Sequence, residues 1–158
     1  MLTGKLCLAQ SAVNSRPPFN LKLFVNDSTF YEAKMAATMF VIDKKTIQIF
    51  PGEKLFIEAE LANDSLVNLK VVPEIMNKEK TLTIVFMQEN ENKLHKQMRL
   101  SITNPFSKQL EYNAQINLMK YKKWTKTSVM PALPGLESYE IWPDIITTAV
   151  LYNFHLKN

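Results

Sequence analysis

Apolar and polar residues alternate along most of this 158-residue chain, and this alternation is the main constraint on its fold. In the clearest run, from Leu110 to Leu118, every second residue is apolar and the residues between them are Gln, Glu or Asn. Successive side chains of a β-strand point to opposite sides, so the run predicts a strand with one buried and one solvent-facing side. Similar runs cover residues 21–25, 31–41, 47–49, 55–61, 67–71, 82–86, 98–102 and 146–156.

These runs predict an all-β fold. No run of 10–15 residues has the spacing of a crossover helix, although Ala and Met within 31–41 leave a helix open there. Polar outer faces favour antiparallel sheets, and the two-layer solution for such strands is a β-sandwich of eight to ten strands. Consecutive prolines at 17 and 18 end an unpatterned stretch. We therefore expect an N-terminal arm or linker over 1–19 and one domain over 20–158.

Two segments carry a family resemblance. The stretch from Asn104-Pro105 to Leu110-Glu-Tyr112-Asn-Ala114, and the hairpin from Ile47 to Ile57, resemble strands of immunoglobulin-like and fibronectin-III-like sandwiches. The resemblance implies that Tyr112 forms a corner hydrogen bond to upstream backbone. It names no functional family and transfers no site residues.

The scarce residue types exclude several cofactor motifs. Three widely spaced glycines allow neither a Walker loop nor a G-x-G-x-x-G turn. One cysteine and two distant histidines exclude a zinc finger, an iron–sulfur cluster and an intrachain disulfide. Cys7 lies in the arm with no base nearby, which gives a nucleophilic role little support. We therefore expect no cofactor and no metal.

Charge and hydropathy bear on partner and compartment. The net charge is +4, and most lysines are dispersed, which speaks against a nucleic-acid partner. No apolar run approaches the ~20 residues that a transmembrane helix needs. The N-terminal apolar stretch is too short for a signal-peptide core, yet low cysteine content also fits an exported bacterial protein. An exported setting, periplasmic or surface, is favoured over a cytoplasmic one.

Residues 130–144 form the most distinctive segment. Three prolines and one glycine predict a long ordered loop here rather than a strand. Aromatic rings beside carboxylates suit a glycan or an extended peptide, and the candidate binding residues are Glu137, Tyr139, Glu140, Trp142 and Asp144. In the favoured alternative, Leu133, Leu136, Ile141 and Trp142 pack into one end of the sandwich.

A second candidate surface is the basic and aromatic stretch 120–126. Aromatic rings stack on bases and ammonium groups meet phosphates, which suits single-stranded nucleic acid or an anionic surface. The residues are Lys120, Tyr121, Lys122, Lys123, Trp124 and Lys126. The favoured alternative is an edge strand or loop whose lysines prevent edge-to-edge pairing, with Trp124 packed inward.

Three functional hypotheses follow. The first is a non-catalytic module that binds another protein or a glycan through the 130–144 loop or through a strand edge. The second is an enzyme acting on glycans or peptides, in which carboxylates of residues 137–144 meet His95 or His155. The third is a nucleic-acid or anionic-surface binder that uses residues 120–126. Neither histidine has a nucleophile or paired carboxylate nearby in sequence, which favours the first hypothesis.

Overall fold

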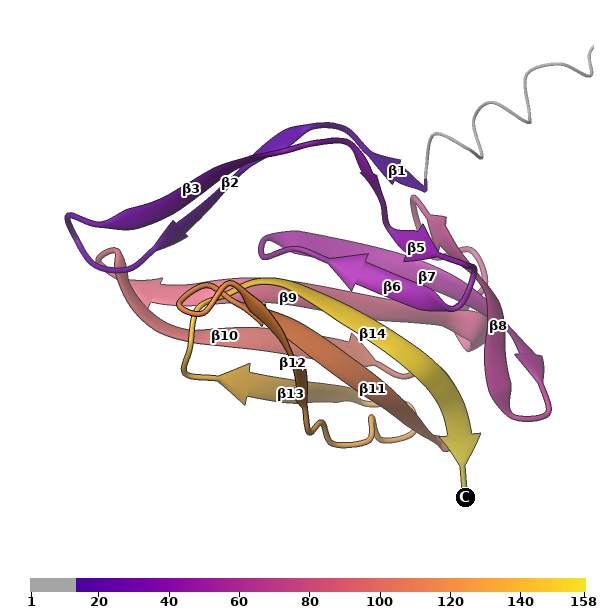
Figure 1. Ribbon diagram of the computed structural model, residues 1–158. Coiled ribbons are helices and arrows are strands. Elements are labelled where there is room, and N and C mark those ends of the chain that lie inside the picture. The colour runs from indigo at the N-terminus through magenta and orange to yellow at the C-terminus, as the bar shows by residue number, and fades with distance from the viewer. Residues whose placement is uncertain (1–13) are drawn as a thin grey trace, which may run out of the picture.

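In the computed structural model, which describes residues 14–158, the chain forms strands and one short 3₁₀ turn, with no α-helix in that range (Figure 1). None of the described residues belongs to a helix long and apolar enough to cross a bilayer. The elements are β1 (Ser15–Arg16), β2 (Phe19–Phe24), β3 (Phe30–Met35), β4 (Thr38–Met39), β5 (Val41–Ile42), β6 (Thr46–Ile49), β7 (Glu53–Ala62), β8 (Ser65–Val72), η1 (Lys78–Lys80), β9 (Thr81–Glu91), β10 (Leu94–Thr103), β11 (Gln109–Leu118), β12 (Lys123–Thr127), β13 (Glu137–Trp142) and β14 (Ile146–Lys157).

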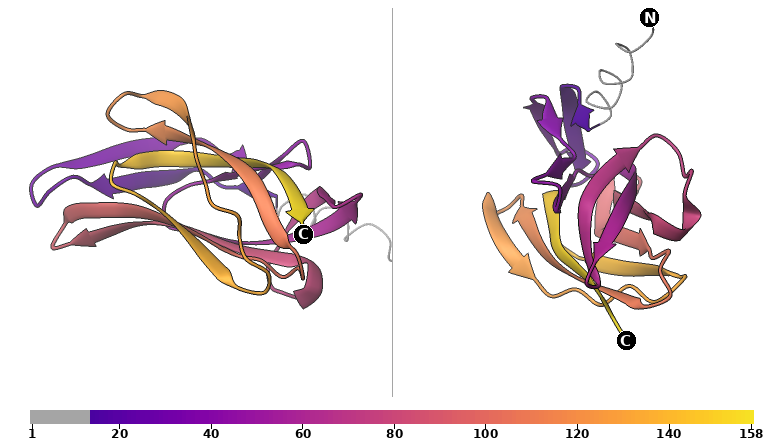
Figure 2. Two further views of the ribbon diagram at one scale, coloured as in Figure 1. Left: turned by 90° about the horizontal axis from the view of Figure 1, so that it is seen from below. Right: turned by 90° about the vertical axis from the view of Figure 1, so that its right-hand side faces the viewer.

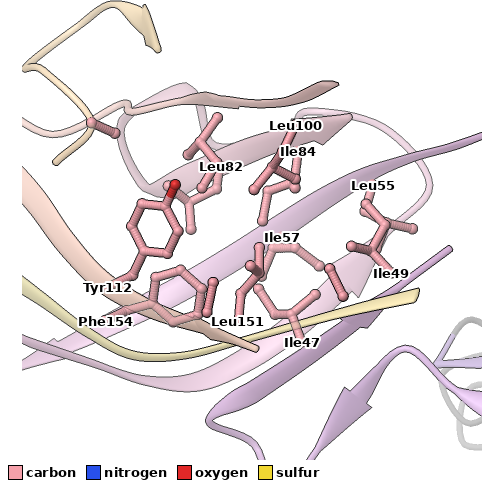
Figure 3. Close-up of a cluster of buried hydrophobic side chains, with 14 of the residues drawn as sticks. Ile47, Ile49, Leu55, Ile57, Leu82, Ile84, Leu100, Tyr112, Leu151 and Phe154 are labelled. Atoms are coloured by element: carbon pink, nitrogen blue, oxygen red, sulfur yellow. The ribbon is translucent and has the colours of Figure 1, made fainter. Parts of the chain in front are cut away.

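The main sheet contains ten strands and is antiparallel. Its order is β12-β11-β14-β8-β7-β9-β10-β13, with β6 paired to β14 and β5 paired to β6. The sheet folds over so that β6, β11 and β14 lie opposite β7, β9 and β10 (Figure 2). The main core fills the space between these two layers, and it includes the buried residues Ile47, Ile57, Leu82, Ile84, Leu100, Tyr112, Leu151 and Phe154 (Figure 3). The predicted all-β antiparallel sandwich is therefore confirmed at this level.

Tight turns connect several strands without glycine. Asn63 and Asp64 have φ angles of 50° and 63°, and Asn92 and Lys93 have φ angles of 50° and 66°. Two consecutive residues of positive φ between paired strands match the twist of a hairpin, and Asn and Asp tolerate this region better than most side chains. The scarcity of glycine therefore does not prevent tight hairpins at residues 62–65 and 92–93.

Strand β14 changes its buried side partway along. The alternation predicts Val150 and Tyr152 on the core side, but this is wrong: Ala149 and Leu151 are buried there instead. Asn153 has a φ of 56°, and the pairing with β11 shifts register beside it. An extra residue in one strand of a pair is a β-bulge, which reverses the side to which the following residues point. Phe154 and Leu156, which follow the bulge, share the core side with Ala149 and Leu151, so Val150 and Tyr152 lie on the outer face.

Strand β8 contains a similar irregularity at Asn68. Its φ is 50°, and the pairing with β7 shifts register between Glu58 and Glu60. Leu66 is buried, whereas Val67, which alternation places on the core side, is only half-buried. These two departures each occur at an asparagine with positive φ, whereas the register shifts beside Thr147 in β14 and Lys96 in β10 do not.

Tyr112 does not make the bond that the family resemblance implies. Its ring stacks on Phe154, with centroids 5.8 Å apart and planes at 16°. Among residues 14–158, no hydrogen bond joins the Tyr112 hydroxyl to upstream backbone. Burial raises the pKa of this hydroxyl above its ordinary value. Tyr112 thus stabilises the domain by packing rather than as a corner.

Strands β2 and β3 form a separate two-stranded sheet that arches over the sandwich (Figure 1). Leu21 and Leu23 on this hairpin are buried in a second, smaller core with Phe50. Near the tip, the backbone amide of Phe24 donates to Gln88 Oε1 at 2.9 Å, and Gln88 Nε2 donates to the Phe24 carbonyl at 2.7 Å. The side chain of Gln88 thus replaces a neighbouring strand at this position.

Arg16 attaches the other end of the β2–β3 hairpin region to the main sheet. Its guanidinium is bidentate to Glu53, with Nε–Oε1 at 2.7 Å and Nη2–Oε2 at 2.9 Å, and the residue is 2% exposed. It lies over the rings of Phe40 and Phe50, 4.1 Å and 4.9 Å from their centroids. Its remaining donors bind Thr38 Oγ1 and the carbonyls of Met39 and Gln48. The sequence boundary at residue 19 therefore leaves out residues that are part of the fold, whereas Cys7 lies outside the described residues.

We expect Arg16→Met to lower the free energy of unfolding by about 3–5 kcal/mol, because it leaves the Glu53 carboxylate without its partner in a largely buried site. Urea denaturation measures this change. Arg99→Met, which removes a half-exposed arginine, should cost less than about 1 kcal/mol. A loss for Arg16→Met no larger than this control would contradict the central role of Arg16.

Lys93→Gly should raise the free energy of unfolding by about 0.5–1 kcal/mol, because glycine adopts the positive φ of this turn without the steric cost of a Cβ. Thermal denaturation with calorimetry measures it. The matched control is Lys54→Gly in the middle of β7, which should lower stability by about 1 kcal/mol. Destabilisation by both substitutions would show that the Asn92-Lys93 turn does not need this conformation.

Candidate functional site

The segment over 130–144 contains a strand, so its prediction as one long loop is wrong. Residues 137–142 form β13, which pairs antiparallel with β10 from Met98 opposite Trp142 to Thr103 opposite Glu137. Proline cannot donate to a β-ladder, but Pro131, Pro134 and Pro143 all lie outside these six residues. Because these three prolines lie close together in the sequence, they hide the six-residue strand between Pro134 and Pro143 from a reading of the sequence alone.

Alternation along β13 divides the candidate residues between two sides. Glu137, Tyr139 and Ile141 are exposed, whereas Glu140 and Trp142 are half-buried. Tyr139 donates its hydroxyl to Glu137 at 2.9 Å, and this bond raises the pKa of the tyrosine. The five predicted residues therefore do not form one surface.

Trp142 contributes to the interior. Its ring meets Phe86 edge-on, with centroids 6.4 Å apart, and its indole Nε1 donates to Thr127 Oγ1 at 3.0 Å. Glu140 accepts a hydrogen bond from the backbone amide of Met130. These two side chains hold the end of β12 and the start of the following segment against β13. Interior packing, one of the two interpretations, accounts for Trp142.

The same interpretation is wrong for the aliphatic residues assigned with it. Leu133, Leu136 and Ile141 are between 50% and 56% exposed. The backbone amide of Leu133 donates to Ser138 Oγ at 3.1 Å, which holds residues 130–136 alongside β13. The resulting surface, which we call the β13 surface, consists of the exposed side chains of Met130, Leu133, Leu136, Tyr139 and Ile141.

Arg99 of β10 borders the β13 surface. It lies opposite Ile141 in the ladder, and its guanidinium is 5.5 Å from the centre of the Tyr139 ring. Glu89 holds the guanidinium with an ion pair of 3.0 Å. The sequence gives no sign of this apolar surface, because Leu133 and Leu136 are residue types expected in the core.

The two histidines lie in different parts of the sandwich. The Nδ1 of His95 lies 2.9 Å from the amide nitrogen of Gln88, and its Nε2 lies 2.8 Å from the Pro143 carbonyl. An amide nitrogen only donates, so Nδ1 accepts and Nε2 carries the proton. Both ring nitrogens of His95 are therefore occupied in connecting the β9–β10 hairpin to Pro143.

His155 pairs with β11 instead. Its Nε2 is 2.9 Å from Glu111 Oε2, and its Nδ1 is 3.1 Å from the Asn153 carbonyl. Lys157, hydrogen-bonded to the same carboxylate, is the main cause that lowers the pKa of Glu111. His95 and Asp144 line one pocket of about 280 Å³, but no group of three or more His, Cys, Asp or Glu among residues 14–158 is placed to hold a metal.

The basic and aromatic stretch divides between a turn and a strand. Lys120, Tyr121 and Lys122 lie in the turn, and Lys123–Thr127 form β12, the edge strand next to β11. The ladder sets Trp124 opposite Asn117 and Lys126 opposite Gln115. The edge position agrees with the favoured interpretation, but Trp124 is 42% exposed and is not packed inward.

A hollow of about 760 Å³ lies beside the C-terminal end of β7. Its lining includes the buried residues Ala59 and Phe106 and the exposed side chains of Leu61, Ile75 and Met76. Alternation places Leu61 on a core-facing side, so the sequence gives no sign of this opening.

Comparisons of the chain with protein-family models, with curated proteins and with solved structures found no match. Function is therefore inferred from the geometry of the residues alone.

Trp142→Ala should lower the free energy of unfolding by about 2 kcal/mol, since truncation of a fully buried tryptophan costs about 3–5 kcal/mol and this ring is half-buried. Chemical denaturation measures the loss. Tyr139→Ala, in the same strand but on its exposed side, should change stability by less than about 1 kcal/mol. Equal melting temperatures for wild type and Trp142→Ala would contradict the packing role.

Proposed function

We propose that the domain is a non-catalytic binding module that recognises another protein through the β13 surface. The observation that carries the proposal is the cluster of large apolar side chains within residues 130–141, all at least half exposed. Contiguous apolar surface is costly in water, and on soluble domains it marks interaction sites.

Chemical character favours a protein partner over a glycan at this surface. Four of its five side chains are aliphatic or thioether groups, which gain free energy by burial but offer sugar hydroxyls no hydrogen bond. Tyr139 and the neighbouring Arg99 belong to the residue types that dominate binding energy in protein interfaces. The partner is therefore expected to present an apolar patch with an acceptor group for Arg99.

The polar groups of this region also favour binding over catalysis. Glu140 is occupied by the amide of Met130, Glu137 by Tyr139, and His95 by Gln88 and Pro143. A general acid or base needs a free proton-accepting atom within reach of substrate. Asp144 lines a small pocket with His95, but both ring nitrogens of that histidine are already used by Gln88 and Pro143.

The test is capture of partner proteins from a native extract by the immobilised full chain, with a photo-crosslinking residue at position 133. Ile141→Asp should reduce capture of the crosslinked protein by about tenfold or more, because a charge would be buried in the interface. The melting temperature should stay within about 2 °C of wild type, since the side chain is exposed.

The matched control is Leu94→Asp, which places the same charge at a similarly exposed leucine in the β9–β10 hairpin. The proposal is contradicted if the control loses the partner to the same extent. It is equally contradicted if Ile141→Asp retains the partner, or if no protein crosslinks to position 133.

A further inference from the structure

Two hollows lie next to each other on the outer face of the layer formed by β6, β14, β11 and β12. The first, of about 360 Å³, is lined by Trp124, Tyr152, Gln115, Thr46 and Val150. The second, of about 380 Å³, has as its polar lining Lys45, Ser65, Asn113, Asn153 and His155. Pockets of this size are at the small end of those that hold ligands.

The two hollows are lined by neighbouring residues. Lys45 and Thr46 are consecutive, as are Tyr152 and Asn153, with one member of each pair in each hollow. Asn113 lies directly opposite Tyr152 and two residues before Gln115, on the same side of β11. We call the two neighbouring hollows together the amide groove.

The groove results from the bulge in β14. Asn153, with its positive φ, moves Val150 and Tyr152 to the outer face, next to Gln115. At the far end of the same layer, Phe50 is covered by Leu21 and Leu23 of the β2–β3 hairpin. The hairpin therefore shields one part of the layer, and the amide groove is the part that stays accessible.

The hydrogen-bonding groups of the groove are available. Gln115 Nε2 donates to the Tyr152 hydroxyl at 3.3 Å, which uses one of its two N–H groups. Within residues 14–158, no hydrogen bond occupies the side-chain amide of Asn113 or of Asn153. The groove thus offers three amides, each with donors and acceptors, beside the indole ring of Trp124.

We propose that the amide groove binds an oligosaccharide. A sugar ring has C–H faces that pack on aromatic rings and a rim of hydroxyls that both donate and accept hydrogen bonds. Trp124 and Tyr152 supply the flat apolar surfaces, and the amides of Asn113, Gln115 and Asn153 match the hydroxyls. One ring lies against Trp124 and the next against the asparagines.

Nucleic acid suits the groove less well. Its affinity comes from cations that neutralise many phosphates, whereas the lining of the two hollows contains three amides and a single lysine, Lys45, with Lys126 opposite Gln115 in the ladder. Thymidine oligonucleotides therefore serve as the competing probe.

The experiment titrates the full chain with short cello-, xylo-, malto-, chito- and galacturono-oligosaccharides and follows calorimetry and tryptophan fluorescence. At least one probe should bind, with a change in the emission of the exposed Trp124. Trp124→Ala should weaken binding about tenfold or more, whereas Trp124→Phe should retain most of it. Asn113→Ala should weaken binding without altering the melting temperature.

Tyr121→Ala is the matched control, because Tyr121 is an exposed aromatic residue of the neighbouring turn that lines neither hollow. Ile141→Asp should leave sugar binding unchanged, which separates this site from the β13 surface. The proposal is overturned if no probe binds at up to about 10 mM. It is also overturned if Trp124→Ala binds like wild type, or if only the oligonucleotide binds in a salt-dependent manner.

Discussion

The buried ion pair between Arg16 and Glu53 holds the two parts of this domain together. A guanidinium removed from water is costly unless all its donors are used, and here carboxylate, hydroxyl and carbonyl oxygens accept from it between two phenylalanine rings. Those acceptors come from β4, β6 and the start of β7, so the pair can form only when the N-terminal segment lies against the main sheet. The β2–β3 hairpin is thereby fixed at one end, and Gln88 fixes it at the other.

The fold class could be predicted from the sequence because most strands have one face in the core. Alternation from 110 to 118 places Leu110, Tyr112 and Ala114 inside, as the structure has them. It fails at Asn68 and Asn153, where a single residue of positive φ reverses the sides of the following residues. Nothing in the local pattern distinguishes such an asparagine from one in a regular strand. The pairing of distant segments by Arg16 is equally invisible, because its partners lie between 22 and 37 residues away.

The sequence indicates which segments contain the candidate sites, but it does not indicate which of their side chains form the exposed surface. Residues 130–144 were identified from prolines beside aromatic residues, and they do form an exposed surface. The strand within them sends Trp142 inward and Ile141 outward, which residue type alone would not suggest. The sequence indicates only one component of the amide groove, the polar side of β11. The aromatic lining comes from β12 and from the bulge in β14, and alternation does not predict that these meet.

The exposure of Met130, Leu133 and Leu136 follows from how the chain protects the edge of β13. An edge strand with unpaired backbone groups invites pairing with another chain, and the segment 130–136 runs along this edge. Its amides at Met130 and Leu133 donate to side chains of β13, whereas Ala132 between them exchanges two backbone hydrogen bonds with Leu110 of β11, so this isolated bridge is the segment's ladder contact. The segment is thus held between β13 and the start of β11, where Ala132 is buried and the side chains of Met130, Leu133 and Leu136 are left exposed. The contacts that cover the edge of β13 therefore also leave these apolar side chains exposed to solvent. A partner that covers the leucines has no need to pair with the strand.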